Sequence, residues 1–139
     1  MSLDDLMRET VVTTATDTLV SDVAATMRDE NVGSAVVVAD DAPVGLVTDR
    51  DIAVRVAADG DDPETLTAAD VMTAEPVTVD VETGVFDLCT AMCDHEVRRM
   101  PVVADGELAG IVTLDDLLVL LTAELGNLAG VIGAESPPY

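Results

Sequence analysis

The chain has 139 residues, enough for a single domain, and it carries 28 acidic residues against six arginines and no lysine, a net charge of −22 at pH 7. This charge argues against nucleic acid and against anionic membrane surfaces as partners. No uncharged apolar run approaches the ~20 residues of a membrane span, and early charges such as Arg8 argue against a signal peptide. We therefore expect a cytoplasmic protein.

Composition also predicts the kind of core. Hydrophobic residues make up 49% of the chain, which argues against disorder, but Phe86 and Tyr139 are the only aromatic residues. The core should therefore be aliphatic. Such an acidic surface is typical of a halophilic cytosol, because at about 1 M salt the Debye length is only ~3 Å and surface repulsion is screened.

The first half of the chain predicts a short helix at residues 3–7, a strand at 10–14 and a helix capped by Asp17 or Thr18. Two wholly apolar strands follow at 35–39 and 44–47, around a turn at 40–43, and a helix runs over residues 49–58. Because these strands lack alternation, they should be buried on both faces.

After a polar linker at residues 59–67, the same unit occurs again. Each residue of the first copy aligns with the residue 65 positions later, and the alignment needs no gap. Residues 37–40 (VVAD) recur at 102–105, and Asp51 falls on Asp116. Each copy is too small to hold a core alone, so we expect the copies to pack together as one body. An apolar helical extension follows the second copy and either covers the core or forms a subunit contact; the extension and tail span residues 127–139.

Each copy contains a strand that ends in Gly-aliphatic-Val-Thr, with an Asp three residues after the Thr, at 45–51 and 110–116. A strand-to-helix junction presents free backbone N–H groups and the positive end of a helix dipole, which favours phosphate. The Thr hydroxyl can donate to phosphate or sugar, and the carboxylate can accept from both hydroxyls of a cis-diol. The Gly would let a ligand approach the strand closely. The pattern therefore indicates a ribose-phosphate ligand.

The same Thr-x-x-Asp pattern is also a helix capping box, in which the Thr and the acid satisfy each other's backbone N–H groups. Because the pattern occurs twice, each time after the same glycine and strand, the ligand interpretation has at least as much support as this structural one. Both can hold together.

With the Asp-x-Met sequences at 5–7 and 70–72 and the stretch RRMPVV at 98–103, these motifs resemble a tandem cystathionine-β-synthase (CBS) domain pair, the Bateman module. The resemblance covers essentially the whole chain. It implies an α/β (α+β) fold of two β-α-β-β-α repeats related by a pseudo-two-fold axis, with repeat 1 at 1–58 and repeat 2 at 68–126. It also implies a non-catalytic sensor, with no required cofactor, whose clefts hold AMP, ADP, ATP or S-adenosylmethionine.

Carried over by position, the resemblance implies that Asp51 and Asp116 hold the ribose hydroxyls, with Thr48 and Thr113 near ribose or phosphate. Backbone groups at two strand ends would line the adenine edge: Thr13, Thr14, Ala15, Thr78, Val79 and Asp80. Aliphatic residues would cover the face of the base: Ala35, Val36, Met100 and Pro101.

The copies differ in their arginines. Arg98 and Arg99 stand where the first copy has Gly-Ser, and Arg50 stands where the second has Asp115. Because the guanidinium fork suits phosphate, the two sites should be unequal, with a phosphate-rich ligand near Arg98 and Arg99. The alternative is that these arginines are surface residues that offset nearby acids.

No catalytic constellation is present, so we expect no enzyme. Cys89, Cys93 and His95 do not have metal-site spacing, and two buried cysteines on one helix face is the preferred interpretation. Two functions stay open. The first is an adenosine-nucleotide sensor that forms a homodimer and acts on an unknown effector protein in trans. The second is a ligand-free protein–protein interaction module whose clefts are closed by their own side chains.

Overall fold

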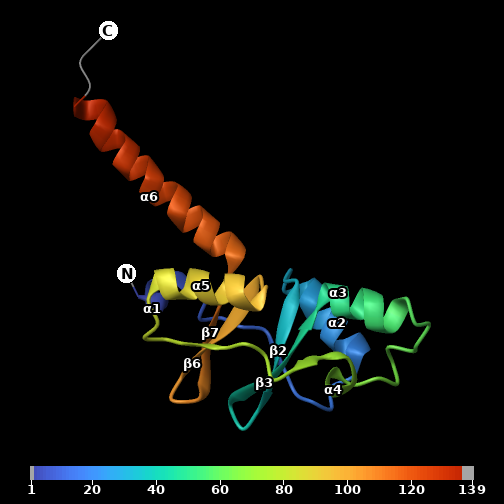
Figure 1. Cartoon of the computed structure of the whole chain (residues 1–139). Helices are drawn as coiled ribbons and strands as arrows, with labels where there is room; N and C mark the ends of the chain where they lie inside the picture. The colour runs from blue at the N-terminus through green and yellow to red at the C-terminus, as the bar shows by residue number, and fades with distance from the viewer. Residues whose placement is uncertain (1, 136–139) are drawn as a thin grey trace.

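Two β-sheets lie side by side, one in each half of the chain (Figure 1). The computed structural model describes residues 2–135, so the predicted tail at 136–139 lies outside the described residues. The first sheet has the order β1 (Thr13–Thr14), β2 (Ser34–Ala39), β3 (Ala42–Thr48), β4 (Thr73–Ala74). The second has the order β5 (Val79–Asp80), β6 (Arg99–Ala104), β7 (Glu107–Thr113). In each sheet, the first strand is parallel to the second, and the second strand is antiparallel to the third.

Helices surround these sheets in the same order in both halves, which confirms the predicted mixed α+β fold of two repeated units. The strand expected at residues 10–14 is reduced to β1, and the helix expected over 49–58 continues after four residues as a π-helical turn, η1. The helices are α1 (Leu3–Leu6), α2 (Val20–Asp29), α3 (Asp49–Ile52), η1 (Ala53–Ala57), α4 (Ala68–Val71), α5 (Val85–His95) and α6 (Leu114–Glu135).

Both hairpins turn on two residues with positive φ. In the second half these are Asp105 and Gly106, as the Asp-Gly signal predicts, and in the first half they are Asp40 and Asp41. The turn expected at 40–43 is therefore shorter than predicted, and Ala42 already belongs to β3. Two-residue turns of this kind match the right-handed twist of paired strands, so they fix the same register in both copies.

The core is aliphatic and divided into two clusters, one beneath each sheet. The first includes Val37 and Val47 from β2 and β3, and the second includes Val102 and Val112 at the equivalent positions. Among the described residues, no charged or polar side chain is fully buried. Aliphatic burial therefore supplies the stability of both halves.

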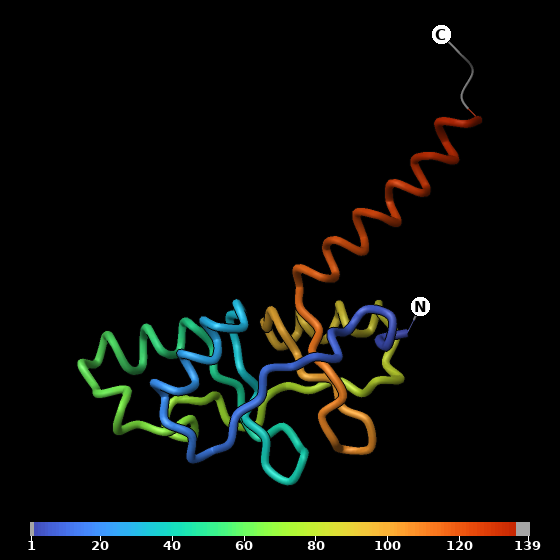
Figure 2. Tube along the Cα trace, turned by 180° about the vertical axis from the view of Figure 1, so that it is seen from behind, coloured from blue at the N-terminus to red at the C-terminus, as the bar shows by residue number. Residues whose placement is uncertain are grey.

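The N-terminal segment of each copy packs on the other copy. Leu3 of α1 is fully buried in the second cluster, and the backbone of Arg8 pairs with Ile111 of β7. Conversely, α4 contributes to the first cluster, and β4 pairs with β3. Figure 2 shows the N-terminal segment running from the second half across to the first. The two halves are therefore tied together by an exchange, and the sequence ranges 1–58 and 68–126 are not the packing units.

The glycine that the two motifs share accommodates this exchange. A methyl group at Gly110 would lie 2.8 Å from the carbonyl oxygen of Arg8 and 2.7 Å from Met7 Sδ, and one at Gly45 would overlap Met72. These are the methionines of the two Asp-x-Met sequences. On the side where each glycine lacks a side chain, methionine therefore occupies the space that the sequence analysis assigned to a ligand.

Helix α6 leaves the body of the protein and points away from both sheets (Figure 1). Its mean hydropathy over an 18-residue window is 1.8, and by length and composition alone it could cross a membrane. This helix contains no long uncharged run, because Glu124 interrupts its apolar sequence. The predicted extension is thus helical as far as Glu135, and it does not cover the core.

Replacing Gly110 by Ala should destabilise the protein by about 1–3 kcal/mol, because the new methyl group collides with the exchanged segment. The matched control is Gly126→Ala in α6, where nothing lies within 4 Å, and which should be neutral or stabilise by up to ~1 kcal/mol. Urea unfolding at a fixed molar KCl concentration measures both. Equal effects of the two substitutions would contradict the close packing at Gly110.

Candidate functional site

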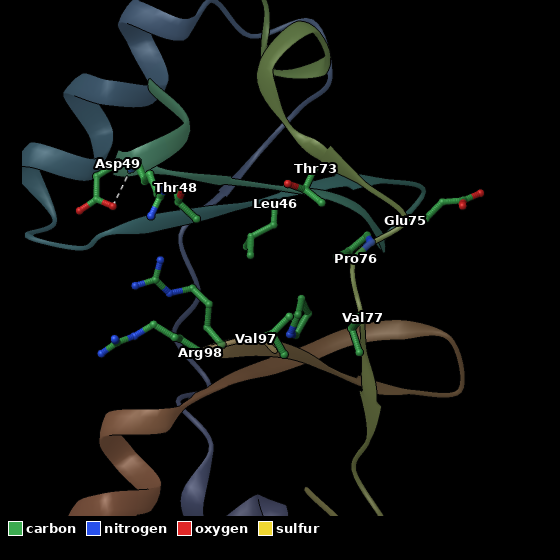
Figure 3. Close-up of a pocket in the computed structure, with 12 residues that line it drawn as sticks. Leu46, Thr48, Asp49, Thr73, Glu75, Pro76, Val77, Val97 and Arg98 are labelled. Atoms are coloured by element: carbon green, nitrogen blue, oxygen red, sulfur yellow. Dashed lines mark hydrogen bonds between the residues drawn. The ribbon is translucent and has the colours of Figure 1, made fainter. Parts of the chain in front are cut away.

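A cavity of about 510 Å³ lies between the two halves, where the end of β3 faces the start of β6. Thr48 and Asp49 come from the first half, and Val97 and Arg98 lie opposite them in the second (Figure 3). The segment that follows α4 closes one side through Pro76. The volume falls within the 300–1,000 Å³ typical of small-molecule sites.

Three arginines line this cavity: Arg50 at the start of α3, and Arg98 and Arg99 at the start of β6. The Arg99 guanidinium reaches across to the first half, where it lies close to Gly33. Arg98 lies 3.7 Å from Asp115, but both side chains are largely exposed, so this ion pair is weak. Half of the chain's six arginines therefore converge on one cavity in a protein of net charge −22.

A second, smaller cavity of about 240 Å³ lies where the pseudo-two-fold axis would place a partner site. Residues 10–12 line the smaller cavity, and the residues 65 positions later, 75–77, line the larger one. The same shift relates Thr48 to Thr113 and Arg50 to Asp115. The two cavities are thus equivalent corners of the duplicated fold, but the smaller one has Asp115 where the larger one has an arginine.

The first Thr-x-x-Asp motif forms a helix cap. Asp51 Oδ2 accepts from the Thr48 backbone N–H at 2.9 Å, and Thr48 Oγ1 accepts from the Asp51 N–H at 3.1 Å. The remaining carboxylate oxygen lies 3.8 Å from Arg55 Nε. Asp51 does not line the larger cavity, so the capping interpretation holds here and Thr48 alone of the pair reaches the cavity.

The second motif carries an additional partner. Asp116 accepts from the Thr113 hydroxyl at 2.9 Å, and Arg8 donates to both carboxylate oxygens, at 3.0 and 3.3 Å. Arg8 belongs to the exchanged N-terminal segment, so this fork–fork contact joins the two halves. Both oxygens that a ribose diol would need are engaged by the protein itself.

Partial burial tends to raise the pKa of Asp116, but hydrogen bonds from Arg8 and Thr113 and the charge of Arg8 outweigh it, so this pKa lies below its usual range. The same contact raises the pKa of Arg8, first through the hydrogen bond and then through the charge of Asp116. The carboxylate and the guanidinium therefore stabilise each other in their charged forms.

The structure brings together part of the predicted site. The larger cavity is lined by five predicted residues: Thr48, Arg50, Arg98, Arg99 and Pro101. The smaller cavity is lined by three: Arg99, Thr113 and Asp115. The others line neither: Thr13, Thr14, Ala15, Ala35, Val36, Asp51, Thr78, Val79, Asp80, Met100 and Asp116. Of these, Ala35, Val36, Val79 and Met100 are buried, so their side chains belong to the core.

Sequence reasoning missed the segments that close each cavity from the side. Residues 73–77 line the larger one, and Arg8 and residues 10–12 line the smaller one. Both follow an Asp-x-Met sequence, so the segments were visible as part of the repeat. What the sequence did not indicate was that each segment crosses to the other copy.

The sequence matches the model of the CBS domain twice, at residues 3–58 and at residues 68–123. The chain belongs to the CBS-domain family. A tandem CBS pair explains the duplicated sheets and the two equivalent corners between them.

This CBS pair is similar in sequence to proteins from a bacterium and from Methanopyrus kandleri. It is 36% identical over 118 residues to the CBS domain-containing protein YhcV of Bacillus subtilis, covering 85% of this chain and 84% of that one. It is 34% identical over 120 residues to an uncharacterized protein of Methanopyrus kandleri, covering 85% of this chain. The match spans only 61% of the length of the Methanopyrus protein.

Solved structures show the same fold. Hypoxic Response Protein I, solved with two coordinated zinc ions, superposes with a TM-score of 0.77 at 32% identity, covering 85% of this chain and 97% of that one. A hexameric CBS-CP12 protein from bloom-forming cyanobacteria gives a TM-score of 0.78 at 30% identity, covering 85% and 66%. In the described part of this CBS pair, no three His, Cys, Asp or Glu side chains are grouped to hold a metal ion. Cys89 is half-buried, and Cys93 is exposed rather than buried as expected.

Replacing Asp116 by Asn should lower the free energy of unfolding of this CBS pair by about 1 kcal/mol at pH 7, because it removes the charged contact with the largely exposed Arg8. The folded-state pKa of Asp116 is lowered, so its contribution is present above the unfolded value of about 3.9 and is lost as pH falls through the folded pKa. The difference between wild type and variant should therefore narrow below about pH 4. Unfolding curves at pH 3 to 7 test this.

The matched control is Asp115→Asn, which removes the same charge from an exposed neighbour and should change the stability at pH 7 by less than ~0.5 kcal/mol. A wild-type advantage over Asp116→Asn that stays constant down to pH 3 would contradict the role given to the Arg8–Asp116 pair.

Proposed function

We propose that this CBS pair is a non-catalytic sensor that binds an adenosine nucleotide in the larger cavity. The observation that carries the proposal is the convergence of Arg50, Arg98 and Arg99 on a 510 Å³ cavity in a chain with net charge −22. Cationic side chains that offset surface acids at random would be spread over the molecule. Their concentration beside one helix start supports recognition of phosphate.

The cavity offers distinct surfaces for the two ends of a nucleotide. The arginines and Thr48 lie at one side, where they would hold the phosphates. Leu46, Val77 and Val97 form an apolar wall suited to the faces of a purine base. With no aromatic ring in this wall, the base would lie between aliphatic side chains. AMP, ADP and ATP combine a purine base with phosphates, whereas S-adenosylmethionine shares the base and has a carboxylate as its only anionic group.

The smaller cavity is proposed to remain closed. Its volume of 240 Å³ is below the range of typical ligand sites, and Arg8 already engages both oxygens of Asp116. The proposed stoichiometry is therefore one nucleotide for each chain. A ligand at the larger cavity contacts both halves, so it could shift their relative arrangement if it prefers one arrangement to another.

The output of the sensor would pass to a separate effector protein in trans or through self-association. Hexameric assembly of the CBS-CP12 protein supports self-association as a property compatible with this fold. We propose a homodimer working in the cytosol at high salt concentration, where the acidic surface is screened.

A second function is favoured by the capping geometry. The Asp51 carboxylate accepts from the Thr48 backbone N–H, and the Asp116 backbone N–H donates to the Thr113 hydroxyl. Neither aspartate lines the larger cavity. If the corners serve only as joints, this CBS pair is a ligand-free protein–protein interaction module. The two functions differ in whether any nucleotide binds.

A thermal-shift series at molar KCl separates them. At least one of AMP, ADP, ATP and S-adenosylmethionine should raise the melting temperature, by roughly 8 °C at 100 times its Kd. Tripolyphosphate at the same concentration controls for non-specific anion effects. If none of the four ligands shifts the melting temperature beyond this control, the sensor function is excluded and the interaction module stands.

Replacing Arg98 by Ala should weaken binding of a nucleotide triphosphate about 3- to 10-fold, because one charged hydrogen-bond donor is lost from a partly exposed site. Adenosine, which lacks phosphate, should bind this variant as it binds wild type. Arg28→Ala, which removes the same charge away from the larger cavity, is the control and should leave affinity unchanged. Calorimetry at constant salt concentration measures the three proteins. Equal weakening by Arg98→Ala and Arg28→Ala would show that only net charge matters.

A further inference from the structure

Three sulfur-bearing side chains lie on one face of α5. Cys89, Met92 and Cys93 are spaced by three and four residues, so successive turns of the helix bring them to the same side. Cys89 and Cys93 are the only cysteines of the chain, and both are free thiols. Every thiol of this protein is therefore found within one turn of one helix.

All three side chains line a cavity of about 310 Å³ between α5 and the start of α6. Met92 is buried, Cys89 is half-buried and Cys93 is exposed, so the sulfur atoms lead from the surface toward the core. The cavity is also lined by Glu96 and Arg98, which are opposite in charge, and the rest of its wall is aliphatic. An ion that enters beside Cys93 would thus meet sulfur in a mainly apolar space.

The first half contains the same cavity without the thiols. Each of the eight residues that line it lies 65 positions before a residue that lines the cavity at α5. Met27 corresponds to Met92, whereas Ala24 and Arg28 stand where the second half has cysteine. The methionine therefore belongs to the fold that both halves share, and the two thiols are particular to the second half.

This set of donor atoms suits a soft metal ion. Thiolate and thioether ligands select Cu(I), which readily forms complexes of low coordination number, whereas a structural zinc site uses four ligands. In the part of the chain that the structure describes, no three His, Cys, Asp or Glu side chains are grouped. His95 is close in sequence, but it does not line the cavity. The spacing that argues against zinc therefore leaves a soft, low-coordinate ion as the fitting ligand.

The spacing along the helix also suits a single ion. Side chains four residues apart on a helix have Cβ atoms about 5–6 Å apart. Two thiolates on opposite sides of one ion need sulfur atoms about 4.6 Å apart, twice a metal–thiolate bond of ~2.3 Å. Rotation about the Cα–Cβ bonds can bring the two sulfur atoms to this separation, so no change of the backbone is required.

We propose that α5 binds one Cu(I) ion through the thiolates of Cys89 and Cys93, with the Met92 thioether as a weaker third ligand. Each thiol releases its proton to solvent when the metal–sulfur bond forms, and the oxidation state of the ion does not change. The site lies outside the cavity proposed for the nucleotide, although Arg98 lines both cavities.

The proposal is tested on the full chain, without nucleotide and without oxygen. Cu(I) supplied as its coloured bicinchoninate complex should transfer to the protein until one ion is bound for each chain. Molar sodium sulfate replaces KCl, because chloride itself binds Cu(I), whereas sulfate favours the folded state. Zinc sulfate at the same concentration as the copper should not displace it.

The ligands are tested one at a time. Cys93→Ser should lower the affinity for Cu(I) at least ~100-fold, and Met92→Leu, which nearly keeps the side-chain volume, only about 10-fold. His95→Ala removes a metal-binding side chain that lies outside the cavity, so it is the control and should leave the affinity unchanged. Circular dichroism and thermal melting check the fold, which Cys93→Ser should preserve because Cys93 is exposed.

The first half allows the site to be transferred. Ala24→Cys/Arg28→Cys places thiols on both sides of Met27, so this variant should bind two ions for each chain. The matched control, Ala24→Ser/Arg28→Ser, should still bind one. A single ion in the cysteine variant, unchanged affinity of Cys93→Ser or displacement by zinc would overturn the proposal. One ion for two wild-type chains would overturn it in favour of a bridge between the Cys93 thiols of two copies.

Discussion

The exchange of N-terminal segments between the two repeats is the constraint on which the rest of this molecule depends. Met7 packs against Gly110 and Met72 against Gly45, so each sheet is completed by a segment from the other copy. Neither half keeps its full core without the other, since Leu3 is buried in the cluster of the second repeat. The duplication therefore produces one cooperative body rather than two domains on a linker.

The same exchange creates the cavities. Each segment that crosses between the halves continues along one side of the space between them, at residues 73–77 in one case and 8–12 in the other. A ligand in the larger cavity would thus contact both repeats and a crossing segment at once. The crossing segment both joins the two halves and lines the cavity. A ligand in the cavity could therefore affect the relative arrangement of the halves.

Much of this architecture was predictable because the sequence contains an internal duplication. The shift of 65 fixes the order of elements, and Asp105-Gly106 fixes the second hairpin. The exchange was not predictable from the sequence. The N-terminal segment would bury the same residues whether it packed on its own copy or on the other copy. Chain direction and loop length decide between them, and neither has a local signature. The glycines offered an indirect signal, but close approach of a methionine and of a ligand require the same absence of a side chain.

The site was only half predictable for a related reason. The arginines were identified because two copies of one motif should be alike, and Arg50 and Asp115 are not. The aspartates were assigned to a ligand on their spacing, but the spacing that reaches a diol also reaches the backbone N–H of the helix cap. Distances decide this, since Asp51 Oδ2 lies 2.9 Å from the Thr48 nitrogen.

Divergence at few positions can explain why two equivalent corners have become unequal. Arg8 stands where the other copy has Thr73, and its guanidinium reaches Asp116 instead of leaving that carboxylate open. Asp115 stands where the other copy has Arg50, so the smaller corner has lost a cation at the helix start. At the smaller corner, the ion pair between Arg8 and Asp116 joins the two halves. The larger corner keeps three arginines, beside Asp49 and Glu75, and these arginines are the basis for the anion site that we propose there.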